Sequence, residues 1–251
     1  YIQKAKELGM QSICFSEHGN FFNWVKKKQY CDKIGIKYIH GQEFYVTETI
    51  ENKVRDNYHC ILIAKNWNGV KELNKLSSIA HRKDGHFYYD ARITIDELTS
   101  VSNNIIISSA CLSGILNCNN EIVKDKFLQF IINNKENCFL EIQHHSDKNG
   151  EQAKYNKYLW ELSKQYSLNL WAGTDTHSID KDTAELRSIL QKSKNINYSN
   201  EEDWDLTFKT YDELVEAYKI QDALPKVVYL EAIENTNRLN DLVENFEFDL
   251  S

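Results

Sequence analysis

Short apolar runs rich in Ile, Val and Leu alternate with amphipathic stretches along most of the chain. The runs have the length of buried strands and lie at residues 11–15, 37–45, 60–64, 104–108, 138–142 and 169–173. Apolar side chains recur at helical spacing between them, near residues 22–33, 67–81, 122–133 and 152–166. Such alternation predicts a parallel, barrel-like α/β sheet. Thr94, followed three residues later by Glu97, predicts a short helix that begins with a capping box.

The strand signal ends near Asp180. Residues 181–192, 210–220 and 223–245 have helical patterns, and a polar loop is expected at 195–203. We therefore expect a barrel over residues 1–180 and a helical extension over residues 181–251.

Composition excludes several classes of protein. The 251 residues are 41% hydrophobic, enough for a full core, but no apolar run approaches the roughly 20 residues that cross a bilayer. Six cysteines without a C-x-x-C pair indicate a reducing, cytoplasmic location. The net charge of −7 argues against tight DNA binding, yet it permits catalysis on phosphates where metals supply positive charge. The only Met is Met10, so the chain is expected to start inside a longer protein.

Two pairs of acids and histidines follow predicted strands. Glu17 and His18 come after the run at 13–15, and Asp175 and His177 come after the run at 170–173. The carboxyl ends of barrel strands meet at one rim, where such side chains can form a metal site. Glu17 and His18 could instead belong to a solvated turn. Asp175 and His177 are alternate residues of an extended segment, so both can reach one ion.

Other candidates fit the same rim less directly. Glu43 lies in an apolar strand and needs a partner, either a metal or a basic side chain. Cys111 is either a core residue or a soft ligand.

His59 begins its strand rather than ending it, so spacing alone favours a core histidine. Adjacent His144 and His145 point oppositely, so at most one should face a shared site. Three histidines are interpreted as surface or packing residues: His40, His81 and His86.

Several longer segments resemble one family. They are SEHGN (16–20), GIKYIHGQEFYV (35–46), YHCILIAKNWNGVKELNKLSS (58–78), SSACLSG (108–114), CFLEIQHH (138–145) and GTDTHS (173–178), with FKTYDEL (208–214) and AIENT (232–236) in the extension. In this order they resemble the PHP (polymerase and histidinol phosphatase) domain at the N-terminus of bacterial DNA polymerase III alpha subunits. Motifs of other hydrolases, such as G-x-S-x-G and H-E-x-x-H, are absent from the sequence.

The resemblance implies a distorted seven-stranded β/α barrel of the TIM-like PHP type. Its metal ligands would be Glu17, His18, Glu43, His59, Cys111, Asp175 and His177. The family usually has Asp at the position of Glu17, and its opening His-x-His strand has no counterpart here, so the first strand is expected to be missing. A complete site would hold up to three divalent ions, of Zn, Mn, Fe or Mg.

The implied activity is a metal-dependent phosphoesterase or 3′–5′ exonuclease, with Asp175, His177 and Glu43 as the catalytic residues. It would belong to a replicative DNA-directed DNA polymerase, whose nucleotidyltransferase site lies outside this chain and towards whose palm residues 181–251 would lead. DNA and other replicase subunits would be the partners, with no membrane. The alternatives are a metal-depleted scaffold of the same polymerase and a stand-alone phosphatase of the histidinol phosphatase type.

Overall fold

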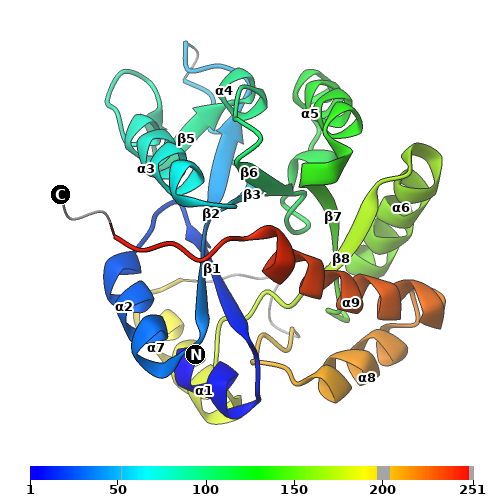
Figure 1. Ribbon diagram of the computed structural model, residues 1–251. Helices are drawn as coiled ribbons and strands as arrows, with labels where there is room; N and C mark the ends of the chain where they lie inside the picture. Colours follow the sequence, from blue (N-terminus) through cyan, green and yellow to red (C-terminus); the bar gives the residue numbers. More distant parts are fainter. Residues whose placement is uncertain (52, 197–203, 249–251) are drawn as a thin grey trace.

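A curled sheet is the centre of the fold in the computed structural model, which describes residues 1–51, 53–196 and 204–248 (Figure 1). The order across the sheet is β4-β5-β2-β3-β6-β7-β8, and β1 pairs with β2 beside β5. The strands are β1 (Ser12–His18), β2 (Lys37–Thr47), β3 (Tyr58–Ala64), β4 (Phe87–Tyr88), β5 (Asp90–Thr94), β6 (Ile105–Ser108), β7 (Cys138–Gln143) and β8 (Asn169–Gly173). All six predicted strands are present, and the two strands that the pattern missed, β4 and β5, are short.

The sheet is mixed, whereas the sequence pattern predicted a parallel one. β1 and β5 run parallel to β2, and β6, β7 and β8 run parallel to one another. β3 is antiparallel to both β2 and β6. Only residues 48–57 join β2 to β3, which is too short for the crossover that a parallel pair requires. The prediction of a parallel sheet was therefore wrong for β3, and this error bears directly on the site.

Helices lie around the sheet (Figure 1), and the last turns of α9 pack against the inner core. They are α1 (Ile2–Glu7), α2 (Trp24–Ile34), α3 (Trp67–Ala80), α4 (Ile95–Thr99), α5 (Glu121–Asn133), α6 (Glu151–Tyr166), α7 (Lys181–Ser193), α8 (Tyr211–Gln221) and α9 (Lys226–Leu242), with 3-10 turns η1 (Ile115–Asn117) and η2 (Lys135–Asn137). Each predicted helix is present, and Thr94 and Glu97 form the expected capping box. Most of the predicted loop at 195–203 lies outside the described residues.

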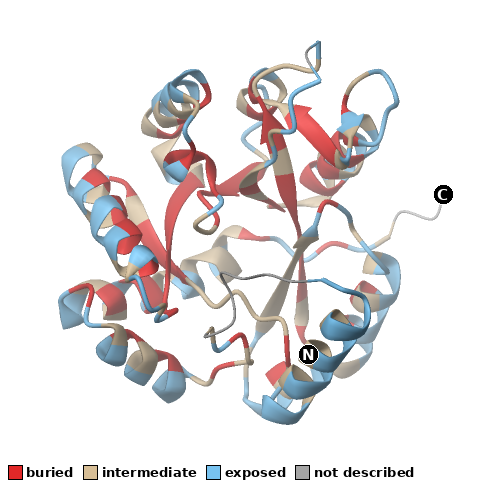
Figure 2. Cartoon of the chain, turned by 180° about the vertical axis from the view of Figure 1, so that it is seen from behind, coloured by how far each residue is buried: buried red, intermediate tan, exposed pale blue. Residues whose placement is uncertain are grey.

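Two apolar cores lie on the two faces of the sheet. The larger one packs between strands and helices, and Figure 2 shows its buried strands within a shell of exposed helix faces. The smaller one lies on the concave face and consists of Ile39, Ile63, Ile106, Phe139, Trp171 and Val243. Phe139 and Trp171 stack there with ring centroids 4.5 Å apart. This inner core supports the strand ends that carry the polar rim.

The helical extension packs on the same sheet. Asn235 in α9 donates a hydrogen bond to the carbonyl oxygen of Leu170 in β8 (2.8 Å). Tyr218 in α8 is buried, and its hydroxyl donates to the carbonyl oxygen of Ile142 in β7 (2.8 Å). These bonds tie α8 to β7 and α9 to β8. No helix among the described residues is both long and apolar enough to span a membrane.

Candidate metal centre

One rim of the sheet gathers the predicted side chains. β1 ends at His18, and β8 leads directly into the segment that contains Asp175 and His177. His59 lies at the start of β3, opposite Tyr45 of β2. β3 runs antiparallel to its neighbours β2 and β6. The beginning of β3 therefore lies at the rim where β2 and β6 end. The reversed direction of β3 therefore brings His59 to the site, which spacing in an assumed parallel sheet did not foresee.

Glu43, His59 and Cys111 form the tightest group on this rim. Their ligand atoms all lie within 4.8 Å of one another. His59 Nδ1 is 3.1 Å from Glu43 Oε1 and 3.4 Å from Cys111 Sγ. Bonds of about 2.0–2.3 Å to a tetrahedral ion would place two donor atoms about 3.3–3.8 Å apart. The separations in this group come close to those that a bound ion requires.

A second group continues from the first. His18 Nε2 lies 3.7 Å from Glu43 Oε1, and the rings of His18 and His177 are 5.3 Å apart. His177 Nδ1 lies 3.5 Å from Asp175 Oδ1 and 2.8 Å from the Asp175 carbonyl oxygen. Donation from Nδ1 to that carbonyl leaves Nε2 of His177 with a free lone pair, the form in which imidazole binds metals. The two groups thus form one continuous set of ligand-type atoms.

The backbone is strained at both groups. Ala110, next to Cys111, has φ 58°, and Asp175 has φ 46°. Residues other than Gly adopt this left-handed conformation rarely, and it is concentrated at functional sites. Gly173 is required for a different reason, since a Cβ there would lie 2.1 Å from Oε1 of the buried Glu141. Ala110 follows β6, whereas Gly173 and Asp175 lie at the end of β8 and just after it.

Burial and charge act oppositely on two of the candidate ligands. Burial raises the pKa of the Cys111 thiol well above its ordinary value, and the carboxylates of Glu43 and Asp175 raise it further. Burial alone would raise the pKa of Asp175, but His145, His177 and His18 outweigh burial and hold it below the ordinary value. Asp175 is thus an anion among imidazoles, whereas the Cys111 thiol needs a nearby cation to ionise.

The residues fit a divalent cation. Glu43 is only 6% exposed, and its buried Oε1 has no hydrogen-bonding partner among the described residues. Buried polar atoms are normally paired, so such an atom suggests a missing partner. Glutamate, histidine and cysteine together are a donor set typical of zinc and similar ions. The group borders a cavity of about 1190 Å³, whose lining includes Glu43, Cys111, Asp175 and His177.

The structure brings together six of the seven predicted ligands and places the seventh apart. Glu17 borders the cavity, but its carboxylate pairs with Lys27 of α2 rather than with the other ligands. Glu17 and His18 are consecutive strand residues, so their side chains point to opposite faces. Sequence reasoning did not assign His145, which lies 3.5 Å from Asp175. The only sequence signal for it was its position at the end of a strand.

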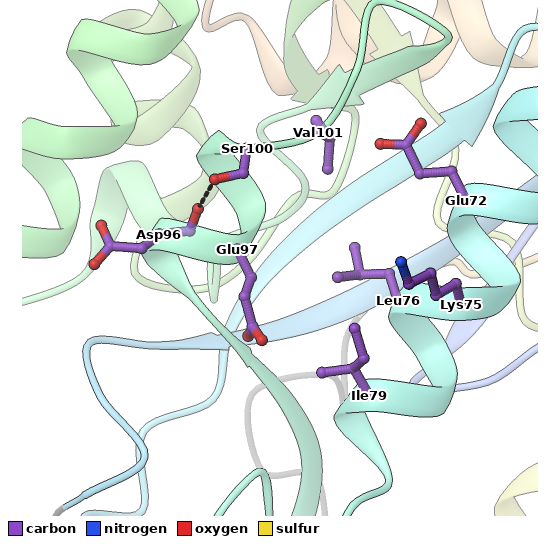
Figure 3. A pocket seen from close by; sticks show the side chains of 8 residues that line it. All are labelled: Glu72, Lys75, Leu76, Ile79, Asp96, Glu97, Ser100 and Val101. Carbon is purple, nitrogen blue, oxygen red and sulfur yellow. Dashed lines mark hydrogen bonds between the residues drawn. The ribbon is translucent and has the colours of Figure 1, made fainter.

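A second hollow, between α3 and α4, lacks these properties (Figure 3). Its lining includes Glu72, Asp96 and Glu97 but neither histidine nor cysteine. These carboxylates already have partners: Glu72 accepts from the Ser102 amide (2.8 Å), Asp96 pairs with Lys126 (2.8 Å), and Glu97 caps its helix. This hollow therefore offers a cation no free ligand.

The chain is similar in sequence to known proteins. The sequence model of the protein family described as PHP domain matches residues 1–150. The DNA polymerase III alpha subunit of Borreliella burgdorferi is 32% identical over 98% of this chain and 22% of its own length. That of Aquifex aeolicus is 33% identical over 75% of this chain and 17% of its own length. The chain thus spans about a fifth of the length of these relatives. A solved structure described as a metal-dependent phosphoesterase from Bifidobacterium adolescentis aligns with a TM-score of 0.43 and 12% identity, over 75% of this chain and 88% of its own.

Proposed function

The chain belongs to the PHP domain family, and we propose on this basis that its rim site binds divalent metal ions and hydrolyses phosphoester bonds. The observation that carries the proposal is the group of Glu43, His59 and Cys111, whose ligand atoms lie within 4.8 Å. The buried Oε1 of Glu43 supports it, because this atom lies 3.1 Å from His59 Nδ1 yet makes no hydrogen bond of normal geometry with any described residue.

Two sets of side chains would hold the ions. Glu43, His59 and Cys111 would hold one, and His18, Asp175 and His177 would contribute to a second. A divalent ion supplies Lewis acidity when bound: it would lower the pKa of a water ligand towards neutral pH and withdraw negative charge from phosphoryl oxygens.

The protein's own groups orient these ligands. Donation from His177 Nδ1 to the Asp175 carbonyl oxygen holds the imidazole with Nε2 free. Strand β2 fixes Glu43 between His18 and His59, 3.7 and 3.1 Å from their nitrogens. We assign Glu43, Asp175 and His177 to contact with the reacting phosphoester, because they border the cavity that a substrate could enter.

The relatives suggest where this activity belongs. They are DNA polymerase III alpha subunits, so we infer that the site serves a cytoplasmic replicase and that its substrate is the 3′ end of DNA. The net charge of −7 makes DNA contacts by this part alone weak, so the rest of the polymerase and other replicase subunits would bring the DNA to the rim.

Metal analysis and a nuclease assay test the proposal. The complete polypeptide encoded by the reading frame is purified and its metal content measured, and a 3′-labelled single-stranded DNA is then incubated with it and Mn²⁺ or Zn²⁺. We expect the wild type to bind metal and to release 3′ nucleotides. Asp175→Ala should lose nucleotide release and bind less metal, whereas the matched control His81→Ala should retain both.

Other outcomes identify the alternatives. A protein without bound metal and without cleavage would leave only a scaffold role. Cleavage of small phosphate monoesters but not of a DNA end would identify a phosphatase. Equal metal content in the wild type and Asp175→Ala would refute the assignment of the site.

A further inference from the structure

His145 lies beside the site, yet it belongs to neither set of proposed ligands. It follows β7, and its side chain has no exposed surface. Its Nε2 lies 3.5 Å from Oδ2 of Asp175, whereas His177 approaches Oδ1, the other oxygen of that carboxylate. Asp175 is therefore flanked by two imidazoles, one at each oxygen.

The environment of His145 does not match that of a packing residue. Neither ring nitrogen makes a hydrogen bond of normal geometry with any described residue. An unpaired polar group in the interior costs free energy that an apolar side chain of similar size would avoid. Asp175 Oδ2 is the acceptor that the position of Nε2 makes available.

An aromatic ring fixes the plane of His145. The indole of Trp204 stacks on the imidazole with centroids 4.5 Å apart and an angle of 1° between the planes. The backbone is held as well, because Gln221 at the end of α8 donates to the carbonyl oxygens of Gln143 (2.9 Å) and His145 (2.6 Å). The ring and backbone of His145 are thus both fixed by residues from the helical extension.

Residues 204–208, which we call the strap, also contact the second ligand group. The amides of His177 and Ser178 donate to the carbonyl oxygen of Leu206 (2.8 and 3.1 Å). The amide of Phe208 donates to the carbonyl oxygen of Ser178 (2.8 Å), and Ser178 and Thr207 form a β-bridge. One short segment therefore contacts both histidines that flank Asp175, at the ring of His145 and at the backbone of His177.

We propose that His145 is a positioning residue, held by the strap through Trp204, which donates Nε2–H to Asp175 Oδ2 and so directs Oδ1 towards a metal ion shared with His177. This inference rests on the proposed function, since it concerns the orientation of a proposed metal ligand. It assigns part of the helical extension to the site rather than to a connection alone.

Titration of the metal-free protein with Co²⁺ under anaerobic conditions tests the proposal. Absorption by the Cys111 thiolate–Co²⁺ pair reports the ion held by Glu43, His59 and Cys111. Total Co²⁺ bound at equilibrium, less that ion, reports the further ion, which is the one that Asp175 and His177 would bind. We expect His145→Leu to leave the thiolate band unchanged and to weaken the further ion by about 10–100-fold, as loss of a partner that orients a ligand does.

Paired variants distinguish positioning from packing. His145→Gln keeps an N–H donor near the position of Nε2 and should recover most of the affinity that His145→Leu loses. Trp204→Ala should weaken the same ion and Trp204→Phe should not, because phenylalanine preserves the stacking surface. His81→Leu, the same substitution far from the rim, should bind Co²⁺ like the wild type.

The outcomes separate the two proposals. A wild-type protein that binds no Co²⁺ refutes the proposed function. A wild type that binds Co²⁺ while His145→Leu matches it for every ion overturns the role of His145 alone. The same conclusion follows if His145→Gln binds as weakly as His145→Leu.

Discussion

Two clusters of histidines and carboxylates lie at different parts of the molecule, and they differ in whether their polar atoms have partners. Near α4, His86 lies between Asp84 and Glu97, at 2.6 Å from Nδ1 and 3.0 Å from Nε2. At the rim, the contacts from histidine nitrogens to Glu43 and Asp175 are 3.1–3.7 Å long. The α4 cluster makes short bonds, whereas at the rim no described residue makes a hydrogen bond of normal geometry to Glu43 Oε1.

The neighbours of His86 complete the contrast. The other oxygen of Glu97 accepts from the Thr94 amide (2.8 Å), and the buried Arg92 donates to the carbonyl oxygens of Val54 (2.6 Å) and Gly85 (3.2 Å). This network satisfies itself and stabilises the fold. The rim contains the same residue types in an arrangement that a cation would complete. Residue type alone therefore does not identify a site, whereas unsatisfied geometry does.

Replacing a rim ligand should have the largest effect. Glu43→Gln keeps the size of the side chain but removes its charge. Metal affinity should fall by more than about 100-fold, which exceeds the loss expected for a residue that only orients a ligand. Calorimetric titration with Zn²⁺ would measure it. His86→Ala is the matched control and should bind Zn²⁺ like the wild type; an equal loss in both variants would remove the distinction between the clusters.

Breaking the α4 cluster should instead affect stability. His86→Ala removes the partner of two carboxylates, and we expect the free energy of unfolding to fall by about 1–3 kcal/mol. Urea denaturation in the presence of a chelator would measure the change. Unchanged stability would mean that the short bonds of His86 contribute nothing and that the two clusters are equivalent.

Buried His40 sharpens the comparison, since its neighbours are aromatic. Its ring stacks on Phe21 at 4.2 Å, and burial lowers its pKa to about 3. The unfolded chain, with a pKa near 6.5, takes up the proton first as the pH falls, so the stabilising effect of neutral His40 is complete above about pH 6.5 and is lost below it. Between pH 7.5 and pH 5 the loss should reach about 2 kcal/mol. Urea denaturation of chelator-treated protein at several pH values would measure this loss. His40→Phe should remove the same amount from the pH dependence of the free energy of unfolding. An unchanged pH dependence would contradict the burial of His40 as a neutral side chain.

The smallest effect is expected from Glu43→Gln without metal. The Glu43 carboxylate lacks a compensating cation when no metal is bound, so it should contribute little to folding. The free energy of unfolding of the variant should differ from that of the wild type by less than about 1 kcal/mol, and the variant should not be less stable than His86→Ala. Thermal unfolding with a chelator would test this. A loss above that of His86→Ala would show that the rim group is a structural ion pair.

The sequence predicted more of the fold than of the site's geometry. Buried runs and helical spacing located six strands and the principal helices, because burial on one or two faces imposes those periods directly. Strand direction was not encoded locally, so the antiparallel direction of β3 was not predicted. The assignment of His59 to the site came only from the family resemblance.

The finer arrangement of the rim depended on three-dimensional packing. The alternation of β1 explains why His18 turns to Glu43 while Glu17 pairs with Lys27, but the sequence did not show which of the two would face the ligands. His145 faces Asp175 because Trp204 and Gln221, far away in the chain, hold it there. No local pattern could have revealed those contacts.

Anomalous scattering from crystals soaked in Zn²⁺ tests the central claim most directly, because it locates the ion among candidate ligands. We predict a peak between Glu43 Oε1, His59 Nδ1 and Cys111 Sγ, the three atoms within 4.8 Å of one another, and none at His86. A peak between Asp84, His86 and Glu97, or a rim without zinc at saturating concentration, would contradict the account.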